Sequence, residues 1–231
     1  MTPKIIQIRI GYSNSILLLN GANSVLIDTG VKGDLLQFKT LFNKYNLKPT
    51  DVKLIVLTHT HNDHTGNLNE LAKLTGAKVL VHKNEYDNLK NGFTPIPSGT
   101  RFYTKAVVFL GRKLKPRHAS PEPFVVDLTN TTNYSLSDYG IDGEVIYTPG
   151  HTAGSQSVLI GKTLIAGDTF FNVREKIVFP PFANNPQQVL RTWKVLFELG
   201  IEEIIPAHGK KFEVEKAIVE FEKWSEKLVS V

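Results

Sequence analysis

The hydrophobic positions of this chain follow two different periods, and segments of the two kinds alternate. Short apolar runs bounded by glycine, asparagine or proline predict β-strands, whereas apolar residues spaced three and four apart predict helices with one buried face. In the first half these patterns predict strands at residues 4–10, 16–19, 25–28, 54–58 and 78–81 and helices at 34–45, 68–74 and 83–90. In the second half they predict strands at 124–127, 144–147, 156–160, 163–166 and 203–205 and helices at 186–199 and 214–228.

Both halves place strands first and helices later. This order favours two sheets packed face to face with helices outside, because a sheet with two apolar faces must cover both. A length of 231 residues, with no short repeat and no linker-like tract, favours a single domain over residues 1–231. The exception to the regular pattern is the proline-bracketed segment at about 92–123, which we expect to be an insertion.

Composition limits the chemistry that is available. The chain has no cysteine, so disulfides and thiolate ligands are excluded and any metal must be held by nitrogen and oxygen donors. Residues 1–20 lack the apolar core of a secretory signal, and no stretch approaches the length of a membrane span. We therefore expect a cytoplasmic protein without a membrane span.

Residues 59–64 carry the strongest chemical signal in the chain. They read His-Thr-His-Asn-Asp-His and directly follow the apolar run at 54–57. His59 and His61 share one side of the extended chain, because side chains two residues apart point the same way. Asp63 and His64 come after the chain has turned and reach a different point, so this spacing can supply two metal ions lying side by side.

Three further ligand-type residues follow predicted strands beside glycine or proline, where loops carry chemistry. His151 lies in Thr-Pro-Gly-His-Thr, Asp168 in Ala-Gly-Asp-Thr, and His208 in Pro-Ala-His-Gly. Each alone would be an ordinary loop residue. Together with the first four they make a set of seven nitrogen and oxygen donors.

These seven residues resemble the metal ligands of the metallo-β-lactamase-fold hydrolase superfamily. Supporting phrases also match at residues 26–30, 148–152, 167–169 and 206–209, so the resemblance runs from about residue 15 to residue 210. It implies an α+β fold, a four-layer αββα sandwich of two mixed sheets flanked by helices, which is the arrangement that the periodicity predicts. It also implies that His59, His61 and His151 hold a first metal, that Asp63, His64 and His208 hold a second, and that Asp168 bridges them.

The resemblance implies a metal-dependent hydrolase with a dinuclear centre of two zinc ions, iron and manganese being alternatives, whose bridging hydroxide attacks a small ester, lactone or thioester. Asp63 would carry a proton to the leaving group. Asp28 would either accept a hydrogen bond from a ligand histidine or cap its own turn. The absence of cysteine departs from the β-lactamase branch that places this residue at the second metal.

Substrate contacts are predicted at Phe171, Arg174 and Tyr103. Residues after the bridging aspartate line the mouth of the site in the superfamily, and Phe171 stands where the acyl-homoserine-lactone lactonases place a tyrosine. The small-molecule substrate is anionic in one interpretation, with Arg174 or Lys176 holding its charge; in the other, both of these residues are merely solvated. Tyr103 belongs to the insertion, in which residues 102–110 are predicted to form a helix.

The insertion has three interpretations. The formal net charge of the chain is +5, yet between Asn88 and Pro121 every charged residue is basic. The segment is a surface insertion with solvated charges, a lid over the metal site, or a helix that lies on a membrane surface. Its place between His64 and His151 favours the lid, because a loop between two ligands begins and ends near the site.

Other functions remain open on the same residues. A phosphodiesterase or nuclease would use the same metals, and the basic insertion keeps nucleic acid as a partner, which a salt-dependent affinity for RNA would support. A mononuclear-iron oxidoreductase resembling the persulfide dioxygenases would leave Asp63, His64 and His208 as surplus ligands. A non-catalytic metal-binding sensor would bind two metals and turn over no substrate.

Overall fold

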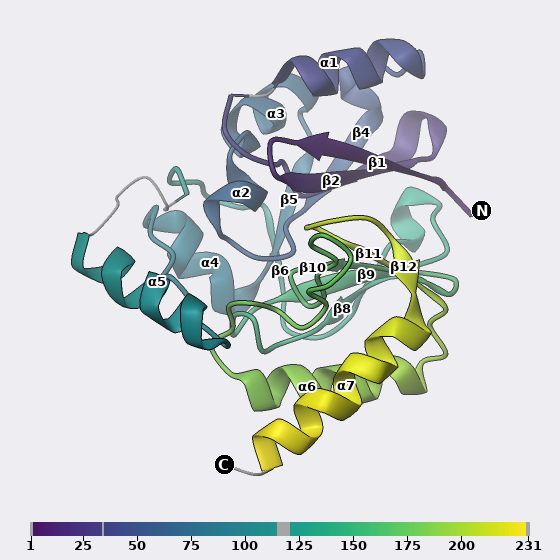
Figure 1. Cartoon of the computed structure of the whole chain (residues 1–231). Helices are drawn as coiled ribbons and strands as arrows, with labels where there is room; N and C mark the ends of the chain where they lie inside the picture. The colour runs from purple at the N-terminus through teal and green to yellow at the C-terminus, as the bar shows by residue number, and fades with distance from the viewer. Residues whose placement is uncertain (1, 34, 115–120, 230–231) are drawn as a thin grey trace.

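The computed structural model describes residues 2–33, 35–114 and 121–229, and two six-stranded sheets form its centre (Figure 1). The first sheet has the order β1-β2-β3-β4-β5-β6, and its strands are β1 (Lys4–Ile10), β2 (Ser13–Leu19), β3 (Ser24–Ile27), β4 (Val52–Val56), β5 (Lys78–His82) and β6 (Leu128–Asn130). The first three strands are antiparallel neighbours, and the pairs from β3 to β6 are parallel. The first sheet is therefore mixed.

The second sheet is also mixed. It has the order β12-β11-β10-β9-β8-β7, and its strands are β7 (Tyr134–Ser135), β8 (Glu144–Tyr147), β9 (Gln156–Ile160), β10 (Thr163–Gly167), β11 (Glu203–Pro206) and β12 (Phe212–Glu213). Only β10 and β11 pair in parallel. The helices are α1 (Leu35–Lys44), α2 (Asn62–Thr65), α3 (Leu68–Thr75), α4 (Lys83–Lys90), α5 (Phe102–Leu114), α6 (Pro186–Glu198) and α7 (Val214–Val229), with short 3-10 turns at Gly21–Asn23, Pro49–Asp51 and Ser137–Tyr139.

Three separate apolar clusters fix the order of the layers. The first packs α1, α3 and α4 against one face of the first sheet, and the second packs α6 and α7 against one face of the second sheet. The third lies between the sheets, where Ile16 and Leu18 of β2 meet Val158 of β9. Leu17, between the two β2 residues, points into the first cluster, because successive strand side chains face opposite sides. The predicted four-layer αββα sandwich is confirmed.

One predicted strand is displaced. The alternating segment 124–127 was expected to be a strand, but pairing with β5 begins only at Leu128. Phe124 and Val126 do pack on the first apolar cluster, so the alternating pattern correctly marks the residues that face the core. The side chain of Asp127, however, accepts the Val79 amide hydrogen at 2.9 Å and takes the place of a backbone partner. Of the predicted helix at 34–45, Asp34 lies outside the described residues.

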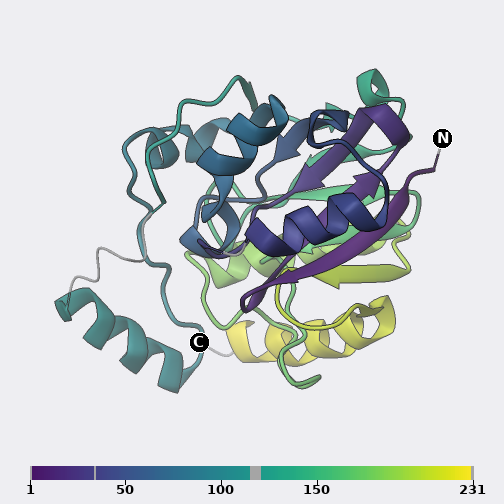
Figure 2. The same cartoon turned by 90° about the horizontal axis from the view of Figure 1, so that it is seen from above.

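The helix of the insertion lies apart from the sandwich. Figures 1 and 2 both show α5 at the periphery of the molecule, beside the layers rather than over either sheet. Lys115 and Arg117 of the insertion lie outside the described residues. Across the described ranges, none of the helices combines the length and the apolar character needed to span a bilayer.

Candidate metal centre

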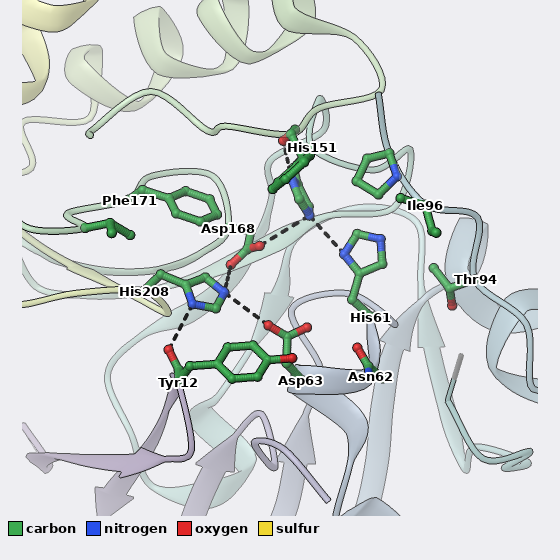
Figure 3. Close-up of a pocket in the computed structure, with 13 residues that line it drawn as sticks. Tyr12, His61, Asn62, Asp63, Thr94, Ile96, His151, Asp168, Phe171 and His208 are labelled. Atoms are coloured by element: carbon green, nitrogen blue, oxygen red, sulfur yellow. Dashed lines mark hydrogen bonds and ion pairs between the residues drawn. The ribbon is translucent and has the colours of Figure 1, made fainter. Parts of the chain in front are cut away.

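The seven predicted ligands converge at one edge of the two sheets, past the carboxyl ends of four strands. Figure 3 shows those that line a cavity, which are His61, Asp63, His151, Asp168 and His208. The segment 59–64 follows β4, His151 follows β8, Asp168 follows β10 and His208 follows β11. Asp168 comes close to the β4 end because Gly167 has a φ of +52° and carries no Cβ, which would lie 2.7 Å from the Cβ of Thr58. The strand ends therefore assemble what the sequence scatters over 150 residues.

A first donor set is made of His59, His61, His151 and one oxygen of Asp168. The Nδ1 atom of His61 lies 2.8 Å from Nε2 of His59 and 3.1 Å from Nε2 of His151. The Oδ2 atom of Asp168 lies 3.4 Å from the same His151 atom and 4.0 Å from Nε2 of His59. The four donor atoms thus surround one point.

A second donor set is made of Asp63, His64 and His208. The Nε2 atom of His208 lies 3.2 Å from Oδ2 of Asp63, and Nε2 of His64 lies 3.8 Å from that oxygen. Both nitrogens lie 3.3 Å from Oδ1 of Asp168. One carboxylate therefore gives one oxygen to each set.

These separations fit a small divalent cation. Zinc–nitrogen bonds of about 2.0–2.1 Å in a tetrahedron place neighbouring donor atoms about 3.4 Å apart, and the separations within both sets scatter around that value. The Nε2 atom of His64 and the Oδ1 atom of Asp168, which both face the second set, are buried without a hydrogen-bond partner. Buried polar atoms in native proteins are rarely left in this state. The donor set therefore fits metal binding.

In every histidine of the two sets except His61, the ring nitrogen opposite the donor atom is already engaged, which turns the other lone pair toward the sets. Nδ1 of His64 donates to Oδ2 of Asp28 at 2.8 Å, so the predicted contact of this aspartate with a ligand histidine is confirmed. Nδ1 of His151 donates to the Phe182 carbonyl at 2.8 Å, and Nδ1 of His208 donates to the Tyr12 carbonyl at 3.1 Å. Each of these three imidazoles is held in one orientation.

The two sets differ in their protonation. Burial lowers the pKa of His59, of His61 and of His151, in the last case to about 4. Burial also disfavours a charged His64, but Asp28, Asp63 and Asp168 outweigh it and hold its pKa well above the ordinary value.

The same competition acts on the remaining members of the second set. Burial opposes the charge of His208, yet Asp168 and Asp63 raise its pKa. Burial also opposes the ionised form of Asp63, but the charges of His64 and His208 lower its pKa to about 2. Without metal the first set is three neutral imidazoles, and the second is a network of carboxylates and imidazolium groups.

A cavity of about 390 Å³ opens over both sets. Phe171, a predicted substrate contact, lines it, and the insertion contributes Thr94, Ile96 and Pro97. Tyr103 and Arg174, the other two predicted contacts, do not line this cavity: Tyr103 is exposed on α5, and Arg174 lines a neighbouring cavity with Arg9 and Lys210.

Sequence reasoning missed Tyr12. It lies in the turn between β1 and β2 and lines the cavity from the side opposite Phe171 (Figure 3). Both rings are nearly parallel to the His208 imidazole, with centroids 6.1 Å away for Tyr12 and 5.0 Å for Phe171. No local motif marks this tyrosine, because only the packing of the two sheets brings its turn to His208.

Sequence reasoning also missed Glu85, a buried carboxylate in the first turn of α4. It accepts hydrogen bonds from the Thr60 hydroxyl, between the predicted ligands His59 and His61, and from the Gly154 amide at 3.2 Å, in the loop after His151. It therefore ties together the two loops that supply the three histidines of the first donor set. The surrounding sequence is polar and predicts a solvated helix turn, so nothing local signals this role.

Comparison with known proteins agrees with the geometry. The model of the metallo-beta-lactamase superfamily matches residues 8–208. A probable metallo-hydrolase of Methanocaldococcus jannaschii is 31% identical over 203 residues, which cover 87% of this chain and 89% of that protein. A hydroxyacylglutathione hydrolase of Shewanella halifaxensis is 28% identical over 118 residues, 51% of this chain and 33% of that protein.

Solved structures show the same fold. A metallo-beta-lactamase superfamily protein of Sulfolobus tokodaii superposes with a TM-score of 0.68 at 23% identity, covering 96% of this chain and 86% of that one. A metallo-beta-lactamase family protein of Thermus thermophilus gives 0.70 at 20% identity, covering 98% and 80%. The family model covers all seven donors and reaches from β1 to β11, and the resemblance seen in the sequence is confirmed: the chain belongs to the metallo-beta-lactamase superfamily.

Proposed function

We propose that this protein is a hydrolase with a dinuclear centre of two zinc ions that cleaves a small ester, lactone or thioester. The observation that carries the proposal is the position of Asp168, whose two oxygens face two separate donor sets. In a mononuclear oxidoreductase Asp63, His64 and His208 would bind no metal, although they converge as closely as the first set does.

Two bound divalent cations supply a nucleophile from water at neutral pH and polarise the carbonyl oxygen under attack. His59, His61 and His151 would hold one cation, Asp63, His64 and His208 the other, and Asp168 both. Asp63 belongs to the second set and also lines the cavity. A carboxylate with one oxygen engaged can use the other for proton transfer, so we assign to Asp63 the delivery of a proton to the leaving group.

The walls of the cavity favour an uncharged acyl group. Beyond the donors, its lining includes Tyr12, Ile96, Pro97, Phe171 and Phe182. No lysine or arginine is among the described residues that line it, so an anionic phosphodiester would find no counter-charge except the metals. The partial match to hydroxyacylglutathione hydrolases makes a thioester the first member of the class to test.

The test couples metal content to turnover. Purified protein is assayed for bound metals by mass spectrometry and against chromogenic ester, thioester, lactone and phosphodiester substrates. We expect two metals per chain, cleavage of one or more acyl substrates, loss of activity with a chelator and recovery with zinc.

A matched control separates metal loss from general damage. His82 is a buried histidine outside both sets, and it stacks on Tyr147. His151→Ala should lose metal and activity together, whereas His82→Ala should keep both. Two bound metals without turnover of any substrate would instead support a sensor, and activity that survives complete chelation would end the hydrolase proposal.

A further inference from the structure

Helix α5 turns an apolar face to solvent. The side chains of Phe102, Tyr103, Val107 and Leu110 are 91%, 53%, 58% and 58% exposed. At 100° per residue these four positions lie within one sector of the helix, together with Ala106. Contiguous exposed apolar surface of this kind marks an interaction site more often than a random feature of a surface.

The orientation of this face is fixed by the opposite side of the helix. Thr104 and Val108 are buried, and the Thr104 hydroxyl accepts the Arg101 amide hydrogen at 2.9 Å. Before the helix, the Thr100 amide and hydroxyl donate to the Pro181 and Pro180 carbonyls. The apolar face therefore does not turn inward by a simple roll of the helix.

Contacts with α7 anchor the same end. The Arg101 guanidinium lies 3.5 Å from an Oε1 oxygen of Glu220 and 5.4 Å from the Trp224 ring centroid. The rest of α5 extends beyond this anchor at the edge of the molecule (Figure 2).

The charge of residues 88–121 indicates what kind of partner can cover this apolar face. Between Asn88 and Pro121 the sequence has no Asp or Glu, and its charged residues are Lys90, Arg101, Lys105, Arg112, Lys113, Lys115 and Arg117. A second copy docked through the same face would bring two such segments together, with like charges opposed. An anionic surface would instead complement them, and helices that lie in the membrane interface combine aromatic and aliphatic side chains with Lys and Arg in this way.

We propose that α5 docks the protein on anionic phospholipid bilayers, with Phe102, Tyr103, Val107 and Leu110 entering the interface. Lys105, which flanks this sector of the helix, then lies at the level of the lipid headgroups. This docking does not depend on the hydrolase proposal, since it involves neither the donors nor the cavity lining.

The experiment is co-sedimentation of the intact protein with vesicles of phosphatidylcholine alone or mixed with about a third phosphatidylglycerol. We expect binding to the anionic vesicles that falls steeply between low and high salt, because exposed charges are screened within about 10 Å at 0.1 M salt. Val107→Glu should reduce binding at least about tenfold, the effect of removing an apolar anchor and adding a repelled charge.

Val195→Glu is the matched control, because Val195 is 57% exposed on α6, far from this segment in the chain. It should bind as the unaltered protein does. Circular dichroism and metal content of both variants report folding independently of lipid. The proposal is overturned if anionic vesicles bind no protein, if Val107→Glu and Val195→Glu bind alike, or if light scattering shows a dimer that Val107→Glu dissociates, in which case a second copy covers the face.

Discussion

The two donor sets share Asp168 but differ in the exposure and in the pKa values of their side chains. In the first set the His59 and His151 side chains are 1% and 2% exposed, and all of its imidazoles have lowered pKa values. In the second, the Asp63 and His208 side chains are 13% and 12% exposed at the cavity, and the histidines have raised pKa values. Neutral imidazoles are buried at little cost, whereas a charged one needs oppositely charged partners, which the fully buried His64 has in Asp28, Asp63 and Asp168. The first set is thus ready for a cation, and the second must release protons to bind one.

Each set has a buried carboxylate behind it, and these also differ. Asp28 contacts the second set directly through His64 and reaches His59 only through the Thr58 hydroxyl, which donates to it at 2.7 Å. Glu85 supports the first set without contacting a ligand side chain in any described hydrogen bond, since it holds Thr60 and Gly154. We therefore expect the loss of Asp28 to weaken metal binding more than the loss of Glu85 does.

The largest expected effect removes what the two sets share. Asp168→Ala deletes one donor from each, so we expect the protein to lose both metals and all hydrolysis. Mass spectrometry of the purified protein measures the metals, with His82→Ala as the control. Retention of one metal would show that one set holds its cation without Asp168, so that this carboxylate is required by the other set only.

The sequence predicts the first half of this site better than the second half. Residues 59–64 lie together in the chain, so strand periodicity and one turn suffice to send their side chains to two points. The assignment of His151, Asp168 and His208 to particular metals came from the resemblance, because no local pattern says which strand ends meet. The four layers were predictable for a similar reason: continuous apolar runs such as 54–57 indicate strands that are buried on both faces.

What escaped prediction depends on contacts between distant segments. Tyr12 and Glu85 acquire their positions from the packing of one sheet against the other, and each lies among polar or glycine neighbours that indicate exposure. The start of β6 was misplaced because a side chain, Asp127, replaces a backbone partner. Hydrophobic periodicity and strand propensity do not indicate where a side chain replaces a backbone hydrogen-bond partner.

The next effect separates the sets by pH. His64 and His208 have raised pKa values, so protons compete with the second cation, and its affinity should fall by about tenfold per pH unit for each proton displaced. In the first set the pKa values of all three histidines are lowered, that of His151 to about 4, so protons compete less with its cation. On acidification from about pH 8 to about pH 5.5 at fixed free zinc, dialysed protein should pass from two metals to one. Simultaneous loss of both would contradict the difference between the sets.

A smaller effect tests the carboxylate behind the second set. Asp28→Asn keeps the size of the side chain and suits its φ of +57°, but it removes the charge opposite His64. We expect the second metal to bind about 10–100-fold more weakly and the first nearly unchanged. The pH dependence of the second metal should also flatten, because the pKa of His64 falls. Competition with a chromophoric chelator resolves the two affinities, and equal weakening of both would indicate general damage.

The smallest effect concerns Glu85, which acts on the first set only by holding its loops. Glu85→Ala leaves the Thr60 hydroxyl and the Gly154 amide without their acceptor, which should cost about 1–3 kcal/mol of unfolding free energy. The first metal should then bind several-fold more weakly, while the second keeps its affinity. Glu85→Gln retains an acceptor of the same size and should restore most of both quantities, measured by thermal unfolding and chelator competition. If Glu85→Ala lowers stability but leaves the affinity for the first metal unchanged, Glu85 supports the fold alone. Of the two buried carboxylates, Asp28 and Glu85, only Asp28 would then affect metal binding.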